Sequence, residues 1–162
     1  MYRFAAQLAA PALRSAARSY ATEAAAVSQN KLTLNLLLPH QALYTKKEVQ
    51  QVNLSGVNGD IGILANHVPI IEELKPGVVE VIEKDGKKNK LFVSGGFAVV
   101  HADSSLNINA IEAFPLDAFD KETIRVGLDE ATRKLTAAKD AAAQAEAKIE
   151  IEVYTALQNA TK

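Results

Sequence analysis

Between residues 31 and 115, apolar residues recur with a period of two in short runs. Leu32, Leu34 and Leu36 are separated by polar residues, which is typical of a strand with one buried face. Five later segments show the same alternation or a short apolar run, at residues 50–54, 79–83, 90–93, 97–101 and 106–111. Many short strands at regular spacing, with no helix among them, predict a β-sandwich or barrel of short antiparallel strands.

Residues 52–81 are the centre of this pattern, and short apolar pieces alternate there with Gly, Asn and Pro. The four glycines and two prolines of this stretch exclude a helix. Asn58 and Gly59 suit a tight turn with positive φ, and Ile61 and Ile63 then point to one face of a strand. The stretch therefore predicts short strands joined by tight turns.

Two further turns are predicted by Gly and Pro. Lys75-Pro76-Gly77 combines a proline that fixes φ with a glycine that is free to become left-handed. Asp85-Gly86 lies between two β-like runs and predicts a hairpin.

Beyond Pro115 the pattern changes to a helical period. Residues 117–162 contain one Gly, no Pro and 11 alanines in 46 residues, which favours helix because Ala loses least on becoming helical. Asp120 is placed as an N-cap, with Phe119 and Ile124 around it as a hydrophobic staple. Two apolar stripes follow at helical spacing: Ile124, Leu128, Ala131, Leu135 and Ala138, then Ala142, Ala145, Ile149, Val153, Ala156 and Ala160.

The residues between these stripes leave two arrangements open. Asp140 is placed to cap a second helix, but no Gly or Pro separates the stripes. The residues allow either a hairpin of two helices or one rod of about 40 residues, roughly 60 Å long. On the solvent side, the spacing predicts ion pairs from Asp129 to Arg133 and from Glu130 to Lys134.

The first 22 residues hold three arginines and no acid. This composition is typical of a mitochondrial presequence; a secretory signal would have a more apolar core, and a disordered basic tail is the other alternative. Arg18-Ser19-Tyr20-Ala21 resembles a matrix-peptidase site, which predicts a presequence over residues 1–20 and a flexible lead-in over residues 21–30. Loss of the three arginines would change the net charge from −1 to −4.

Composition excludes several classes of protein. The chain has 162 residues, 48% of them hydrophobic and 23% charged, with a net charge of −1. This charge argues against nucleic acid as a partner, because neutralising phosphates requires a basic surface. No apolar run has the length of a membrane span. The absence of Cys excludes disulfides and thiolate metal sites.

The sequence contains no recognisable catalytic or metal-binding constellation. None of His40, His67 and His101 has a second His or a carboxylate at metal-ligand spacing on a recognisable helix. His67 reads as a turn histidine bonded to backbone, or alternatively as part of a subunit contact. Asp60 and the pair Glu72-Glu73 read as solvated loop charges.

Two glycine-containing motifs lack the residues that known catalytic patterns require. Ser94-Gly95-Gly96 lacks the glycine two residues before Ser that a nucleophile elbow needs. Gly56-x-x-Gly59-x-x-Gly62 matches neither a phosphate-binding loop nor a dinucleotide fingerprint, and no long helix follows it. We therefore predict no catalytic residue, no cofactor and no metal.

The central stretch resembles a known family through Gly59-Asp60-Ile61-Gly62-Ile63-Leu64, then His67, Pro69 and Leu74-Lys75-Pro76-Gly77. This run is similar to that of the F-type ATP synthase central-stalk subunits, called epsilon in bacteria and delta in mitochondria. Ser94-Gly95-Gly96-Phe97 resembles the family's next marker. Where the family usually has Pro-Gly before the histidine, this chain has Ala65-Asn66. Because Asn tolerates the left-handed region, Asn66 is predicted at positive φ.

The resemblance implies an α+β fold, with a β-sandwich over residues 31–115 and a helical hairpin over residues 116–162. It implies a non-catalytic rotor subunit on the matrix side of the inner membrane, bound to gamma, the c-ring and the mitochondrial epsilon subunit. Gly59, Asp60, Ile61 and Gly62 are expected to form a loop that faces the c-ring, and His67 to lie at a subunit contact or turn. The alternative function is a matrix small-molecule-binding β-sandwich or a hydrolase with a helical lid.

The resemblance also bears on whether the helical hairpin binds nucleotide. Some bacterial relatives bind ATP through an apolar-Asp-x-x-Arg-Ala motif on the first helix of the hairpin. The nearest match here runs from Leu128 to Arg133, with Thr132 in place of the motif's Arg and Arg133 in place of its Ala. One position on a helix is a rotation of about 100°, so Arg133 points away from the face that the motif needs. We therefore expect no nucleotide binding.

Cleavage between Tyr20 and Ala21 is the first testable prediction. The acid-free leader and the position of Arg18 predict that the mature protein begins at Ala21. The intact mass of protein purified from mitochondria measures this directly. A mature chain that still carries Arg3 and Arg14 would contradict it.

Overall fold

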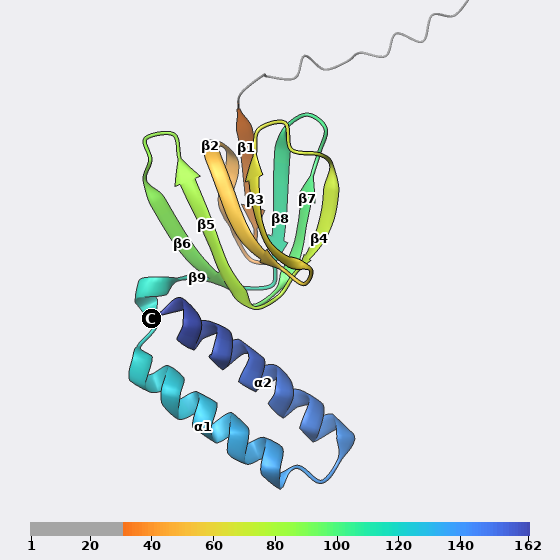
Figure 1. The fold of residues 1–162 in the computed structure, drawn as a ribbon, viewed down its shortest axis with the longest axis vertical. Coiled ribbons are helices and arrows are strands. Elements are labelled where there is room, and N and C mark those ends of the chain that lie inside the picture. The colour runs from red at the N-terminus through yellow and green to blue at the C-terminus, as the bar shows by residue number, and fades with distance from the viewer. Residues whose placement is uncertain (1–30) are drawn as a thin grey trace, which may run out of the picture.

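The computed structural model describes residues 31–162, which form a β-sandwich followed by two helices packed at one end of it (Figure 1). The predicted presequence over residues 1–20, its cleavage between Tyr20 and Ala21, and the lead-in over residues 21–30 lie outside the described residues.

The described residues form nine strands. They are β1 (Leu32–Leu37), β2 (Ala42–Gly56), β3 (Gly59–Leu64), β4 (Ile70–Leu74), β5 (Gly77–Glu83), β6 (Lys88–Val93), β7 (Gly96–Val100), β8 (Ser105–Ala110) and β9 (Ala113–Pro115). The predicted β-sandwich is confirmed, with two differences in detail. β2 is long, at 15 residues, and β1 pairs with β8 in parallel, whereas the other pairings are antiparallel.

Strand β2 joins the two layers of the sandwich. Its first half pairs with β1, from Leu32 opposite Val49 onward, and its second half pairs with β3 and β5. At its last residue, Gly56, it also meets Leu74 of β4. The path β1-β8-β7-β4-β2 therefore returns to β1, and these five strands close a ring. Strand β3 pairs with β2 alone and lies off this ring.

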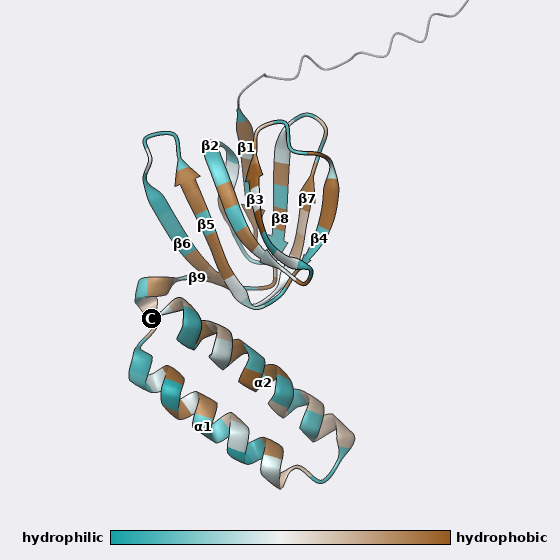
Figure 2. Cartoon of the chain, viewed as in Figure 1, coloured by the Kyte–Doolittle hydropathy of each residue, from teal (hydrophilic) through white to brown (hydrophobic). Residues whose placement is uncertain are grey.

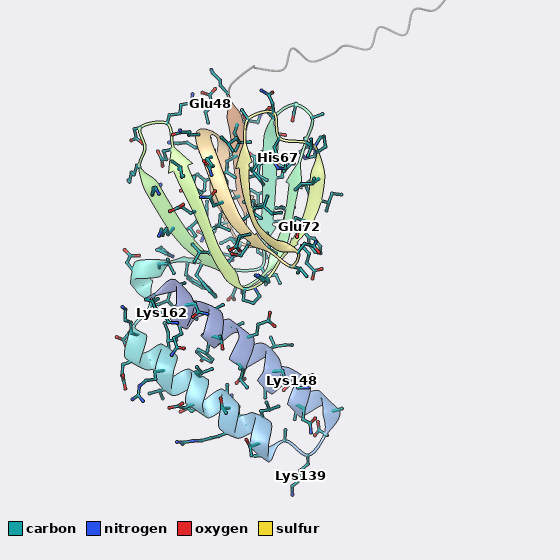
Figure 3. The ribbon with its side chains drawn as sticks, viewed as in Figure 1. Glu48, His67, Glu72, Lys139, Lys148 and Lys162 are labelled. Carbon is teal, nitrogen blue, oxygen red and sulfur yellow. The ribbon has the colours of Figure 1, made fainter. Side chains whose placement is uncertain are left out.

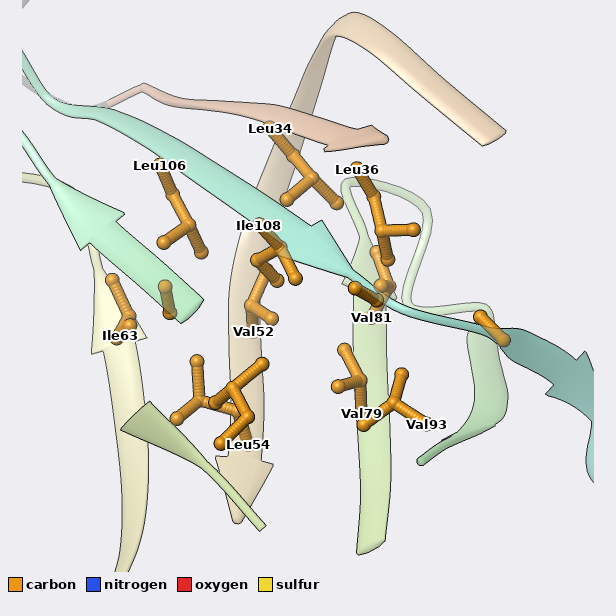
Figure 4. Close-up of a cluster of buried hydrophobic side chains, with 14 of the residues drawn as sticks. Leu34, Leu36, Val52, Leu54, Ile63, Val79, Val81, Val93, Leu106 and Ile108 are labelled. Atoms are coloured by element: carbon orange, nitrogen blue, oxygen red, sulfur yellow. The ribbon is translucent and has the colours of Figure 1, made fainter. Parts of the chain in front are cut away.

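The core lies between the layers and is built by the alternation seen in the sequence (Figures 2 and 4). Leu32, Leu34 and Leu36 are fully buried, as are Leu106 and Ile108 on the neighbouring β8. Each such side chain contributes about 1.5–3 kcal/mol relative to an exposed one. The period-two pattern thus accounts both for the strands and for their orientation.

The turns follow the sequence prediction except at one glycine. Gly59 and Gly86 have positive φ, at 134° and 84°, as predicted for tight hairpins. Gly77 was expected to be free to become left-handed, but its φ is not in that region. A Cβ at Gly77 would lie 2.8 Å from the Cβ of Ser55, so glycine is needed there because a neighbouring side chain comes close.

A short 3-10 helix, η1 (Leu116–Ala118), leads into helices α1 (Lys121–Ala137) and α2 (Ala141–Ala160). The backbone N–H of Thr123 donates to Asp120 at 2.8 Å. This hydrogen bond is the largest of the causes that lower the pKa of the Asp120 carboxyl. Asp140 caps α2 by accepting a hydrogen bond from the backbone N–H of Ala143 at 2.7 Å. Because Ala138 has extended backbone with ψ 123°, the helices separate, and the hairpin is confirmed over the single rod.

The hairpin packs along the stripe predicted for α1 but along only the second half of the stripe predicted for α2. Ile124 and Ala131 of α1 are buried as expected. On α2 the buried residues are Ala147 and Leu157, whereas Ile149 of the predicted stripe is exposed. In the second half of α2 the prediction holds, because Val153, Ala156 and Ala160 pack against the cluster that contains Leu157. In the first half it was wrong, because alanines occupy most positions there and do not distinguish one face from another.

Exposed ion pairs on the hairpin also differ from the spacing argument. Lys134 was expected to pair with Glu130 but reaches across the hairpin to Glu150, with Nζ and Oε2 2.8 Å apart. The predicted ion pair from Asp129 to Arg133 does not form among the described residues, whereas Arg125 pairs with Glu122.

A small aromatic cluster attaches the hairpin to the sandwich. Phe92 of β6 packs with Ile124 and Leu157 of the helices. Phe119 contacts Phe92 and Phe114 edge to face, with ring centroids 5.8 and 6.2 Å apart. Such pairs add about 0.5–1.5 kcal/mol beyond their buried area. The hairpin thus has its own hydrophobic cluster, separate from the core of the sandwich.

Candidate functional site

The predicted c-ring-facing residues lie at the start of β3, next to a two-residue turn formed by Val57 and Asn58. The resemblance implied a loop over residues 59–62, but they belong to a strand paired with β2, as the alternation of Ile61 and Ile63 predicted. Asp60 lies opposite Ser55. Asp60 is exposed. The turn is at the end of the sandwich that faces the helices (Figure 1). A strand holds Asp60 more rigidly than a loop would.

Gly62 lies further along β3, opposite Asn53. A Cβ at Gly62 would be 3.1 Å from Oδ1 of Asn53 and 3.2 Å from Nε2 of Gln51, and these two side chains hydrogen-bond to each other at 2.6 Å. Ile61 packs against the core and Ile63 is fully buried in it. The glycine of β3 therefore makes room for a pair of polar side chains on the neighbouring strand β2.

Glu72 on β4 is a residue that the sequence reasoning missed. It was read as a solvated loop charge, but it faces inward and is only 8% exposed. Its Oε1 accepts hydrogen bonds from the backbone N–H of Asn58 at 3.3 Å and from Nδ2 of Asn58 at 3.1 Å. The alternation along β4 was the available signal, because Glu72 shares the inward phase of Leu74.

His67 lies beyond the other end of β3, so the structure separates it from Asp60. Figure 3 shows His67 away from the helices and Glu72 nearer to them. Nδ1 of His67 lies 2.8 Å from the carbonyl oxygen of Val68, which agrees with the interpretation of His67 as a turn residue bonded to backbone. Asn66 beside it has φ 61°, as predicted. The backbone N–H of Asn66 donates to Oγ of Ser104 at 2.8 Å.

An apolar surface lies on the outside of β4 and β7. Ile71 is 74% exposed and Phe97 is 53% exposed. The strand register places Ile71 beside Val99 and Glu73 beside Phe97, so these four side chains share one face. We call Ile71, Phe97 and Val99 the outer apolar patch. Exposed apolar groups that adjoin one another in this way mark surfaces for a protein partner.

Two grooves bear on the small-molecule alternative. One is lined by residues of β1, β4, β7 and β8 with their connections, among them Leu37, Phe97 and Ile111, and no residue of the hairpin lines it, so the helices do not form a lid over it. The other lies where α2 meets the sandwich and contains Asp60 and Lys90, but no histidine. Among the described residues, no side-chain hydrogen bond joins Ser94 or Ser55, the serines that line these grooves, to a carboxylate or a lysine.

Residues 31–162 contain no cluster of three or more His, Asp or Glu side chains suited to holding a metal ion. Of the two described α-helices, neither is long and apolar enough to cross a membrane. The described residues thus form a module with a ring-closed sandwich, an exposed apolar patch and an attached helical hairpin.

Comparison with known proteins places this module. Residues 31–115 match the model of the ATP synthase delta/epsilon chain β-sandwich domain. The chain is 51% identical over 154 residues to ATP synthase subunit delta, mitochondrial, of Yarrowia lipolytica, covering 95% of this chain and 93% of that one. It is 53% identical over 147 residues to the protein of the same name from Saccharomyces cerevisiae, covering 91% and 89%.

Solved structures agree with this placement. A chain of the Euglena gracilis mitochondrial ATP synthase, in a structure of OSCP, F1 and c-ring, superposes with a TM-score of 0.77 at 30% identity, covering 82% of each chain. A chain from the Tetrahymena thermophila central stalk and c-ring has the same fold, with a TM-score of 0.60 at 18% identity, covering 82% of this chain and 97% of that one. The chain therefore belongs to the ATP synthase delta/epsilon family, in its branch of mitochondrial delta subunits.

The turn that carries His67 generates a testable prediction at Asn66. Because Asn66 is left-handed, Asn66→Gly should be tolerated. Asn66→Val should lower the free energy of unfolding by about 1 kcal/mol or more, since a β-branched residue is strained at this φ. Thermal unfolding of the two variants measures the difference, and equal stability would contradict a strained turn.

Proposed function

We propose that the chain is a non-catalytic subunit of the central stalk of mitochondrial ATP synthase, on the matrix side of the inner membrane. In this role it joins gamma to the c-ring and transmits the rotation driven by proton flow to the catalytic head. The observation that carries the proposal is the outer apolar patch on a ring-closed sandwich, in a chain of this family.

The apolar patch is the surface proposed for gamma. Ile71, Phe97 and Val99 adjoin one another on two paired strands, and Ile111 nearby is 63% exposed. Burying such side chains against a partner removes apolar area from water, which is the main favourable term in association. The mitochondrial epsilon subunit is proposed as a further partner, by resemblance to the family. His67 is proposed to lie at a subunit contact.

The end of the sandwich that carries Asp60 is proposed to face the c-ring. Asp60 is exposed and paired to β2, so its carboxylate is presented to another chain from a fixed backbone. Transmission of torque requires stiffness at this point, and closely packed interiors resist deformation. The fully buried core behind β2 and β3, including Val52, Leu54 and Ile63, supplies that packing.

Crosslinking tests this orientation. Because the chain has no Cys, Asp60→Cys introduces a single thiol, and it should crosslink to a cysteine in a c-ring loop of the assembled synthase. Asp85→Cys is the matched control, since Asp85 is an exposed acid in the β5–β6 turn, away from the helices (Figure 1). Crosslinking of Asp60→Cys to the alpha or beta subunits alone would contradict the proposal.

A second test concerns nucleotide. We propose that the hairpin does not bind ATP, because Thr132 cannot supply the forked, charge-assisted contact that phosphate draws from Arg. The hydroxyl of Thr132 instead donates to the carbonyl oxygen of Leu128 at 2.8 Å. Calorimetric titration with millimolar ATP should show no saturable binding. Binding that disappears in a chain truncated at Asp117 would show that this proposal is wrong.

A further inference from the structure

We propose that Glu72 is a positioning residue that fixes the β2–β3 turn and thereby presents Asp60 to its partner. The inference rests on the proposed c-ring contact of Asp60 and adds a residue to it. Glu72 lies on β4, 12 residues after Asp60, and its carboxylate reaches the turn that immediately precedes Asp60.

The first observation is that the backbone of β2 leaves space for the carboxylate. A Cβ at Gly56 would lie 2.4 Å from Oε1 of Glu72 and 2.9 Å from its Cδ. The side chain of Glu72 therefore occupies the volume that a side chain at position 56 would fill. Gly56 is also the one residue at which β2 and β4 are paired, opposite Leu74. The carboxylate is thus packed onto the point where the ring of strands closes.

The second observation is what the carboxylate binds. Its hydrogen bonds come from Asn58, through the backbone N–H at 3.3 Å and through Nδ2 at 3.1 Å to Oε1 and 3.4 Å to Oε2. Within residues 31–162, Glu72 forms no ion pair. Buried carboxylates are costly unless hydrogen-bonded, so Asn58 and Glu72 hold each other in place.

The third observation is that Glu72 accepts every hydrogen bond that Asn58 donates among the described residues. Asn58 is exposed, and β3 pairs with β2 alone. The backbone gives the turn one further attachment to β4, from the N–H of Val57 to the carbonyl oxygen of Glu73 at 2.9 Å. Asp60 is two residues beyond Asn58, in the second residue pair of the hairpin. A displacement of the turn therefore moves Asp60.

The contact can be removed from either side. Glu72→Leu deletes the acceptor but suits a buried position, and exposed Asn58 can bond to water instead, so the fold should persist. Gly56→Ala keeps Glu72 and displaces its carboxylate with one methyl group. Glu72→Gln keeps an acceptor of the same shape and is the rescue variant.

Two measurements decide the proposal. In the full chain, hydrogen exchange at the Asn58 amide should accelerate by about tenfold or more in Glu72→Leu and Gly56→Ala, the change expected for a lost hydrogen bond to a charged group. In the assembled synthase, the rate of crosslinking from Asp60→Cys to the c-ring should fall several-fold in the same two backgrounds. Glu72→Gln should restore both towards the parent values.

The outcomes separate this inference from the proposed function. An unchanged Asn58 exchange rate overturns the role of Glu72 whatever the crosslinking shows. Faster exchange with unchanged crosslinking also overturns it, because the turn would then move without moving Asp60. If Asp60→Cys with native Glu72 does not crosslink to the c-ring, the proposed function fails and the positioning role fails with it, while the exchange result still decides the contact between Glu72 and Asn58.

Discussion

The structure depends on the backbone pairing of one strand, β2, with strands from both layers. β2 bonds to β1 along its first half, to β3 and β5 along its second half, and to β4 at Gly56. Because the ring β1-β8-β7-β4-β2 closes through it, the ring has no free edge within itself. The inward residues of β2, Val49, Val52 and Leu54, are almost completely buried. Loosening β2 would therefore expose the core to water.

The hairpin depends on different contacts. Its attachment consists of the aromatic group around Phe92 and Phe119 and the apolar side of α2 near Leu157. The core of the sandwich is a separate cluster that shares none of these residues. The core of the sandwich therefore contains no residue of the hairpin, whereas the cluster of the hairpin includes Phe92 of β6. This asymmetry suits a module whose rigid part bears load while its helices serve another contact.

Much of the fold was predictable, because it is determined by local chemistry. Period-two alternation predicted the strands, Asn66 at positive φ followed from the tolerance of Asn for that region, and Asp120 and Asp140 cap helices as their side chains suggest. These signals need only neighbours in sequence. The hairpin itself followed from resemblance, since Asp140 alone did not decide between two helices and one.

The remaining features needed tertiary contacts. The alternation along β4 gives Glu72 its inward phase, but the room for its carboxylate is left by the backbone at Gly56, 16 positions earlier. The glycine at position 77 has an ordinary φ and is needed because Ser55 lies against it. The phase of α2 depends on which of its alanines meet α1. In the candidate site, the resemblance singled out Asp60 but implied that it lies in a loop and not in a strand.

The position of β3 shows how these contacts combine. Of the strands in residues 31–162, it is the one that pairs only with β2, so a ladder holds one of its edges and no described strand holds the other. Each of its ends is instead fixed by a polar side chain from another part of the fold: Glu72 bonds to Asn58 before it, and Ser104 bonds to Asn66 after it. An apolar residue at position 72 could fill the same volume, but it could not orient an amide. Burying an acid at position 72 costs free energy, and a need to hold the β2–β3 turn in one orientation explains that cost. The residue whose position depends on this turn is Asp60.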